Sequence, residues 1–327
     1  SLSAFFSQVG RKPTGVQGED YIFHQRGIAV AKNVKSGEEL RPAALGIAYD
    51  NILPDQDPRL FLADWMSDPQ NQFFAKAVVN RYWKHFFTRG LIEPEDDIRD
   101  TNPPTNPELL AALEQHFIQS GFDLKELVRV ITQSHAYQLS SQPNEANLVD
   151  RQNYSRFYPR RMQAEVLHDS IDDLTGNQTS YANLPAGTRA IALPDNSYNR
   201  SSEFLRVFGR PENTSVCECE RVQTSSLAQS LHLLNSNEMK TRLATNNGTA
   251  AQLAAAEDST EANIHRLYLI AFCRKPTPSE LEAARDYLAQ PVLDANDQPI
   301  AEKQSELQNY RDLIWALMNA KEFLFNH

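Results

Sequence analysis

Two cysteines separated by a single residue stand in a strongly charged segment that runs from Arg210 to Arg221. They are Cys217 and Cys219, and the chain has only three cysteines. Covalent attachment of a c-type haem needs Cys-x-x-Cys-His, whereas this spacing is one residue short and no histidine follows. The pattern therefore excludes haem attachment within this chain.

Three other kinds of chemistry remain open for these cysteines. A zinc site would need further ligands, and His232 and Cys273 lie at spacings that match no common zinc finger. A disulfide across one intervening residue is feasible but strained, and it would be easily reduced. We rank a structural or disulfide role first, metal binding second and a catalytic thiol third. The flanking charged residues could be charge partners or ligand contacts; they are Arg210, Glu218, Glu220 and Arg221.

A second group of candidates lies on and after a strongly apolar predicted helix over residues 72–89. Apolar residues occur on nearly every side of this helix, so we expect it to be central and its polar residues to need partners. The preferred interpretation is a buried ion network that fixes helix packing. The residues of this network are Asn80, Arg81, His85, Asp96, Asp97 and Arg99.

Arg81 and His85 also allow a functional interpretation, in which His85 is an acid or base and Arg81 binds an anion. In the preferred interpretation, Arg81 is buried and pairs with a carboxylate of residues 93–97 or with Glu165. Its replacement by Met would then cost about 3–5 kcal/mol, because a buried carboxylate would be left unpaired.

A polar stripe follows one face of a predicted helix over residues 160–174. Arg161, Glu165, His168 and Asp172 recur at intervals of four, three and four residues. Glu165 and His168 match the Glu-x-x-His pair with which di-iron helix bundles hold metal, but such a site needs a second pair and the sequence offers none. We therefore predict a solvated or salt-bridged stripe and no metal site.

Composition argues against several classes of function. The 42 acidic residues outnumber the 32 basic ones, and the net charge of -10 repels nucleic acid and anionic lipid. Apolar stretches are short, so we expect no membrane-spanning segment. Glycine-rich phosphate loops, Gly-x-Ser-x-Gly and His-Glu-x-x-His are absent, which removes the usual support for nucleotide-binding, serine-hydrolase and zincin functions.

Helical periodicity dominates the chain, and we predict a mainly α, multi-helix globular domain with a small N-terminal β-hairpin. The hairpin is expected within residues 19–34 around Arg26 and Gly27, with strand confined to the region before residue 40. Residues 175–200 have no periodic pattern and suggest a binding loop. Helices are predicted over residues 58–66, 72–89, 106–119, 123–137, 160–174, 201–208, 225–245, 260–273, 278–290 and 302–325.

Capping signals mark the starts of three of these helices. Asp57 precedes Pro58, a residue type favoured in the first turn of a helix. Asp123 is expected to cap the helix that follows it. Residues 277–280 have the Ser/Thr-x-x-Glu form of a capping box.

Nine short motifs occur in order along residues 57–323, nearly the whole chain. They are residues 57–65, 80–87, 96–99, 102–110, 134–141, 160–165, 208–211, 217–221 and 315–323. Together they resemble the domain of unknown function at the C-terminal end of planctomycete-type surface proteins that carry a planctomycete cytochrome c domain.

The resemblance implies a domain organisation and a location. Residues 57–327 would form the α-helical domain of this family, and residues 1–56 the tail of the preceding domain, as a hairpin and an extended connector. A c-type haem would belong to a domain further upstream, and no cofactor is expected in this chain. The protein would be extracytoplasmic, in the periplasm or at the cell surface. The resemblance implies no catalytic residues.

Two functions from different classes are consistent with these features. In the first, the domain is a binding or interaction module for a glycan, a protein ligand or its own upstream cytochrome domain. In the second, it is an enzyme acting on complex carbohydrate and coupled to electron transfer through the upstream haem. We favour the module, because no nucleophile, metal set or cofactor motif stands out.

The extracytoplasmic location implied by the resemblance makes a Cys217–Cys219 disulfide the expected state. Cys273 follows an apolar run and is expected to be a buried free thiol. Mass spectrometry of protein alkylated without reduction should therefore show a bridge between the two close cysteines. Three labelled thiols after oxidative purification would reject the bridge, and copurifying zinc would favour a metal site.

Overall fold

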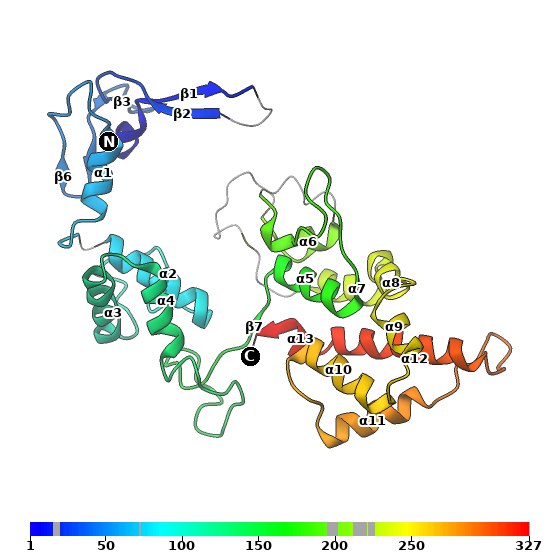
Figure 1. Ribbon diagram of the computed structural model, residues 1–327. Helices are drawn as coiled ribbons and strands as arrows, with labels where there is room; N and C mark the ends of the chain where they lie inside the picture. The colour runs from blue at the N-terminus through cyan, green and yellow to red at the C-terminus, as the bar shows by residue number, and fades with distance from the viewer. Residues whose placement is uncertain (16–19, 72, 195–201, 212–220, 222–225, 327) are drawn as a thin grey trace. The chain divides into compact units, whose positions relative to one another are not determined.

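The computed structural model describes residues 1–327 except 16–19, 72, 195–201, 212–220, 222–225 and 327. Helices dominate the described residues, and the strands are short antiparallel pairs (Figure 1). The predicted mainly α fold is therefore confirmed. The chain divides into two compact units, Ser1–Tyr158 and Pro159–His327, which we call unit 1 and unit 2.

Unit 1 begins with a short 3-10 helix, η1 (Leu2–Phe6), which is followed by three small strand pairs. The antiparallel pairs are β1 (Val9–Pro13) with β2 (Asp20–His24), β3 (Ala31–Lys32) with β4 (Glu39–Leu40), and β5 (Ala43–Ala44) with β6 (Ile47–Ala48).

The predicted hairpin that turns at Arg26 and Gly27 is wrong, because its two segments pair with other strands. The turn that closes β3 and β4 forms instead after Asn33, whose side chain accepts a hydrogen bond from the Lys35 amide at 2.9 Å. Gly37 then takes a φ of 71°, which an L side chain rarely adopts.

Four helices complete unit 1: α1 (Pro58–Met66), α2 (Phe74–Phe87), α3 (Pro107–Gln119) and α4 (Leu124–Gln133). The predicted caps are confirmed, since the Asp57 carboxylate accepts from the Arg59 amide and Asp123 accepts from two amides of α4. One face of each of the last three helices packs into the hydrophobic core of unit 1. This core includes Val79, Trp83, Phe87, Leu110, Phe117, Leu127 and Ile131.

The expectation that α2 is surrounded by apolar contacts is wrong, because only one of its faces is buried. Ala75, Val79, Asn80, Trp83 and Phe87 are buried, whereas Phe73 just before the helix is 40% exposed. A 14-residue helix that packs against two neighbours on one side leaves its other side to solvent, and the polar residues there need no buried partner.

Unit 2 is built around α5 (Ala164–Thr175), whose Leu167, Ile171 and Leu174 are fully buried. Its other elements are η2 (Ala190–Ala192), α6 (Glu203–Val207), α7 (Leu227–Asn235), α8 (Asn237–Leu243), α9 (Thr249–Ala255), α10 (Thr260–Phe272), α11 (Pro278–Leu288), α12 (Glu302–Met318) and α13 (Lys321–Leu324), with β7 (Arg160–Arg161) paired to β8 (Phe325–Asn326).

Several boundaries in unit 2 differ from the predicted ones. The single helix predicted over residues 225–245 is wrong, and α7 and α8 are separate, because Ser236 is extended and its hydroxyl caps α8 by accepting from the Met239 amide. Strands at 160–161 and 325–326, like β5 and β6 of unit 1, lie outside the region predicted to hold strand. The predicted capping box at 277–280 is confirmed.

The end of α5 and the start of α9, a helix that the periodicity did not predict, touch through two glycines. A Cβ on Gly176 would lie 2.8 Å from the Thr249 amide nitrogen, and one on Gly248 would lie 2.8 Å from the Thr175 carbonyl oxygen. Any larger residue at either position would force the two backbones apart, so this contact requires glycine.

Cys273 is exposed, and the prediction of a buried thiol is wrong. It ends α10 in a left-handed conformation with a φ of 56°, and this turn carries the side chain out of the apolar face that precedes it.

Among the described residues, no helix is both long and apolar enough to cross a membrane.

Candidate functional site

The polar stripe of α5 is buried and salt-bridged rather than solvated. Glu165 is 6% exposed and His168 is 1% exposed. Charged groups at this depth need partners, because their transfer from water to the interior is costly. The partners come from later segments of unit 2 and form two clusters, one around Glu165 and one around His168.

The first cluster joins three of the predicted site residues. Arg221 donates to both carboxylate oxygens of Glu165, at 2.7 and 3.2 Å, and Arg210 Nε lies 3.2 Å from Glu165 Oε1. The two arginines follow Glu165 by 45 and 56 positions (210 − 165 and 221 − 165). A carboxylate held by two guanidiniums fixes both later segments to α5.

Arg161 lies beside this cluster. Its Nη2 donates to the Phe208 carbonyl oxygen at 2.9 Å, and its guanidinium carbon lies 5.4 Å from the Phe208 ring centroid. Burial, followed by the charge of Arg221, lowers the pKa of Arg161. Glu165, Arg210 and Arg221 therefore form one ionic group, and Arg161 lies beside it against Phe208.

The second cluster is centred on Arg242 of α8. Its guanidinium donates to Asp172, to His168 Nε2 at 2.6 Å and to Glu238 Oε1 at 2.9 Å. His232 Nε2 lies 3.5 Å from the other oxygen of Glu238. Arg242 and Glu238 were not predicted, although their spacing of four residues on one helix is typical of an ion pair.

The second cluster shifts the pKa values of two of its members away from neutral pH. Burial, with a contribution from Arg242, lowers the pKa of His168 to about 3. Burial would raise the pKa of Glu238, but hydrogen bonds from His232 and Arg242 outweigh it and lower that pKa to about 2. A neutral His168 whose Nε2 already accepts from Arg242 is engaged in packing and is not free to take a proton from a substrate.

A third set of contacts ties the loop after α5 to the same helix. Asp169 accepts from the amides of Ala190 and Ile191, at 2.7 and 3.2 Å. Arg189 donates to Asp173 at 2.8 Å. Part of the predicted binding loop over residues 175–200 is thus fastened to α5, and residues 195–200 lie outside the described residues.

The candidates of unit 1 lie at the surface, and the predicted burial of Arg81 is wrong. Arg81 forms a two-pronged pair with Asp96, and the two side chains are 44% and 59% exposed. Arg99 pairs with Asp97 at 2.8 Å, and His85 is exposed, with its ring edge-on to Phe86. The expected partner segment was correct, but an open ion pair contributes little to stability.

Asn80 is the buried polar residue of α2. It is fully buried, and its side chain exchanges two hydrogen bonds with the backbone of Ile92, at 2.9 and 3.0 Å. It also donates to the Glu95 carbonyl oxygen at 3.1 Å. Asn80 therefore holds the loop that follows α2 against the core of unit 1.

Cys217, Glu218, Cys219 and Glu220 lie outside the described residues, so their pairing and contacts remain predictions. In the part of the chain that the structure does describe, no group of three or more His, Cys, Asp or Glu side chains is arranged to hold a metal ion.

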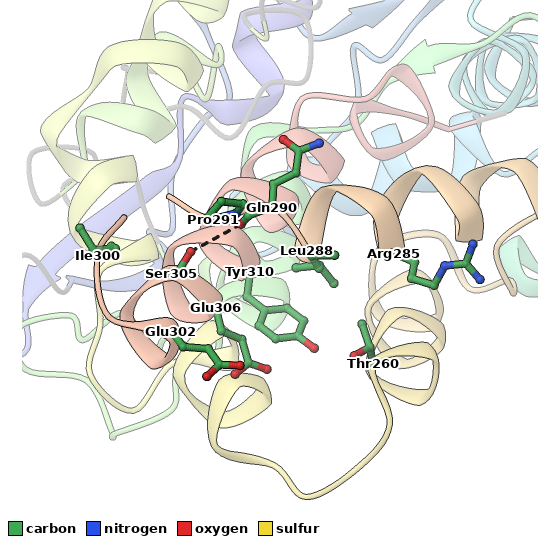
Figure 2. A pocket seen from close by; sticks show the side chains of 11 residues that line it. Thr260, Arg285, Leu288, Gln290, Pro291, Ile300, Glu302, Ser305, Glu306 and Tyr310 are labelled. Atoms are coloured by element: carbon green, nitrogen blue, oxygen red, sulfur yellow. Dashed lines mark hydrogen bonds between the residues drawn. The ribbon is translucent and has the colours of Figure 1, made fainter. Parts of the chain in front are cut away.

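Two pockets lie among the C-terminal helices of unit 2. One, of about 440 Å³, opens between the end of α11, the loop that follows it and the start of α12. Figure 2 shows the ring of Tyr310 inside this pocket, with Glu302 and Glu306 from one side and Arg285 from α11. The second, of about 530 Å³, lies between α11 and α12. No predicted site residue lines either pocket.

Unit 2 is therefore a helical domain whose central helix, α5, is held by buried ion pairs. Its described pockets are lined by residues of other helices. Residues 58–288 match the family described as PSD1, a protein of unknown function (DUF1553), and the chain belongs to that family. The predicted resemblance to a domain of unknown function is confirmed at this level. No curated protein and no solved structure matches the chain.

Replacing Asn80 by Ala should destabilise unit 1 far more than replacing its neighbour Arg81 by Met. The first change leaves the Ile92 amide and buried carbonyls unpaired, and we expect a loss of about 2–4 kcal/mol. The second removes an exposed pair and should cost at most about 1 kcal/mol. Urea unfolding followed by tryptophan fluorescence, to which Trp83 of the same core contributes, measures both. Equal losses would contradict this assignment.

Stability should fall as the pH drops below about 6.5, because the unfolded chain protonates His168 in this range and the folded protein does not. Above pH 6.5, His168 makes its full contribution to the free energy of unfolding. Down to pH 5 the loss approaches about 1.4 kcal/mol per pH unit for this group. The range from pH 6.5 to 5 lies above the pH at which Glu238, whose pKa is lowered, becomes protonated and stops contributing to stability. The raised pKa of Asp172 acts in the opposite direction near the lower end of the window.

His168→Gln keeps an acceptor for Arg242 and removes the titration, so its unfolding free energy should depend less on pH between 6.5 and 5. Urea unfolding at several pH values in this window provides the comparison. The matched control is His265→Gln on α10, a histidine with 31% exposure of its side chain. The assignment fails if wild type and His168→Gln show the same slope.

Proposed function

We propose that this chain is a helical binding or interaction module of an extracytoplasmic, planctomycete-type surface protein with a cytochrome c domain upstream. The observation that carries the proposal is the state of the α5 polar residues. Glu165 and His168 are buried and held by arginines, which is the arrangement expected of a brace. The described pockets lie on α10, α11 and α12 instead, and are lined by aromatic, aliphatic, acidic and neutral polar residues together with Arg285.

The location and the cytochrome context rest on the sequence motifs alone. The candidate ligands are a glycan, a protein or the cytochrome domain of the same protein. A pocket of several hundred Å³ among rigid helices is of the size that holds a small ligand or a protruding group of a large one. Because the pockets lie apart from the ionic clusters of α5, binding there would not disturb the brace.

One observation favours the enzyme as a second candidate. His168 Nδ1 is buried, and the nearest carboxylate oxygen, Asp172 Oδ2, lies 3.7 Å away, beyond hydrogen-bonding distance. Because Nε2 accepts from Arg242, the neutral ring carries its proton on Nδ1, and this N–H is the group through which His168 could act as an acid. In this alternative the protein acts on complex carbohydrate, with electrons passing through the upstream haem.

The two functions differ in what happens to a bound ligand. The full chain is immobilised and exposed to polysaccharides, to extracytoplasmic proteins and to a separately produced cytochrome domain. Binding is measured by interferometry, and the recovered ligand is examined by chromatography and mass spectrometry. We expect a ligand that binds reversibly and returns chemically unchanged, with equal affinity for wild type, His168→Gln and the control His265→Gln.

Chemical conversion of a ligand would contradict the proposed binding function if the His168→Gln variant, shown to be folded, no longer carried it out. Removing a general acid or base typically lowers the rate by roughly 10²–10⁴-fold. The same loss in His265→Gln would not support a catalytic role for His168, because that side chain lies on the surface of α10.

A further inference from the structure

The pocket between α11 and α12 is walled by aromatic rings and small side chains. Tyr287 of α11 and Trp315 of α12 are 39% and 36% exposed, and Tyr268 of α10 is buried beside them. Alanines at 283, 284 and 316 leave the space between the rings open. The remaining lining residues are Glu280, Asp312, Leu313 and Leu317.

The lining carries negative charge and no basic side chain. Glu280 and Asp312 are its charged members. Glu280 is bound by Arg274, which donates to both of its carboxylate oxygens at 2.8 Å and also to Glu322. Two carboxylates and one guanidinium leave this trio with a net charge of minus one, so Arg274 does not make the pocket positive.

Asp312, in contrast, is held by neutral partners. It accepts from the Tyr287 hydroxyl at 3.1 Å and from Gln308 Nε2 at 2.9 Å, and both donors are neutral. Among the described residues, no cation pairs with Asp312 and none lies over the rings of Tyr287 or Trp315. The carboxylate is therefore oriented beside two aromatic rings with its charge uncompensated.

Aromatic faces with a nearby carboxylate attract cations, because the face of the ring is the negative end of its quadrupole. Arg274 already illustrates this attraction, with its guanidinium carbon 5.7 Å from the ring centroid of Tyr268. A second cation, supplied by a ligand, would find the rings of Tyr287 and Trp315 and the charge of Asp312 in the lining of the pocket.

The lining selects one kind of cation. A primary ammonium has three N–H donors and is strongly hydrated, so it needs several free acceptors. Here Glu280 is already paired with Arg274, Asp312 is the one lining carboxylate that no cation pairs with among the described residues, and the other walls are methyl groups and rings. A quaternary ammonium has no donors and carries apolar methyl groups, so it loses least on entering such a pocket.

We propose that this pocket binds a quaternary ammonium group, held by Tyr287 and Trp315 and by the charge of Asp312. The assignment deepens the proposed binding function and rests on it. A volume of about 530 Å³ leaves room for the trimethylammonium head and part of the chain that carries it.

The test uses choline and its neutral isostere 3,3-dimethylbutan-1-ol, in which carbon replaces the charged nitrogen. Each is titrated into the full chain and followed by ligand-observed NMR. We expect choline to bind saturably and roughly tenfold more tightly than the isostere, since shape is matched and only the charge differs. Added salt should weaken choline binding and leave the isostere unaffected.

Two substitutions distinguish the contribution of the aromatic rings to choline binding from that of the negative charge. Trp315→Leu keeps an apolar wall and removes a π face, and Asp312→Asn keeps an acceptor and removes the charge. Each should weaken choline binding severalfold without weakening that of the isostere to the same degree. The matched control is Asp286→Asn on α11, whose exposed carboxylate does not line the pocket. Thermal unfolding checks that every variant is folded.

Equal affinity for choline and its isostere, or no saturable binding of choline, would overturn the assignment. Retention of wild-type affinity in both Trp315→Leu and Asp312→Asn would overturn it as well. If the same protein then still bound a glycan or protein ligand, only this inference would fail and the binding function would stand. If every ligand were instead converted chemically, the proposed function itself would fail.

Discussion

A buried carboxylate on the central helix of unit 2 requires cationic partners, and the rest of that unit is arranged to supply them. Glu165 is held by Arg210 and Arg221, from segments 45 and 56 positions further along the chain. About one and two turns later on α5, Arg242 of α8 contacts His168 and Asp172. Removing one partner would leave a charge stranded in the interior, so these contacts restrict how α6, α8 and the loops between them can lie against α5.

This bracing bears on function, because it engages the side chains that would otherwise be the natural candidates for chemistry. An arginine that holds a buried glutamate is not free for a substrate anion, and a histidine that accepts from an arginine is a poor base. The open surfaces of α11 and α12 carry different chemistry, with exposed rings and a carboxylate bonded only to neutral donors. This contrast between the braced helix α5 and the exposed rings of α11 and α12 is the basis of our proposals.

Local signals in the sequence predicted most of the helices and their starts. Asp57, Asp123 and the capping box at Thr277 act within one turn, so they work whatever the rest of the chain does. The same local logic failed where two local preferences compete. Ser236 is compatible with a helix interior, but as a cap it ends one helix and begins the next, and Asn33 with Gly37 sets a turn that displaces the expected hairpin.

The sequence by itself determined the helical class, the positions of the caps and the family, because periodicity, capping residues and short motifs are properties of neighbouring residues. It also identified Glu165, Arg210 and Arg221 as candidates, though not as partners. Only the tertiary structure decided which polar residues are buried. Asn80 and Arg81 are adjacent in α2, yet one is sealed inside and the other is in water. Successive residues of a helix point about 100° apart, and the packing of other helices selects the face that is covered.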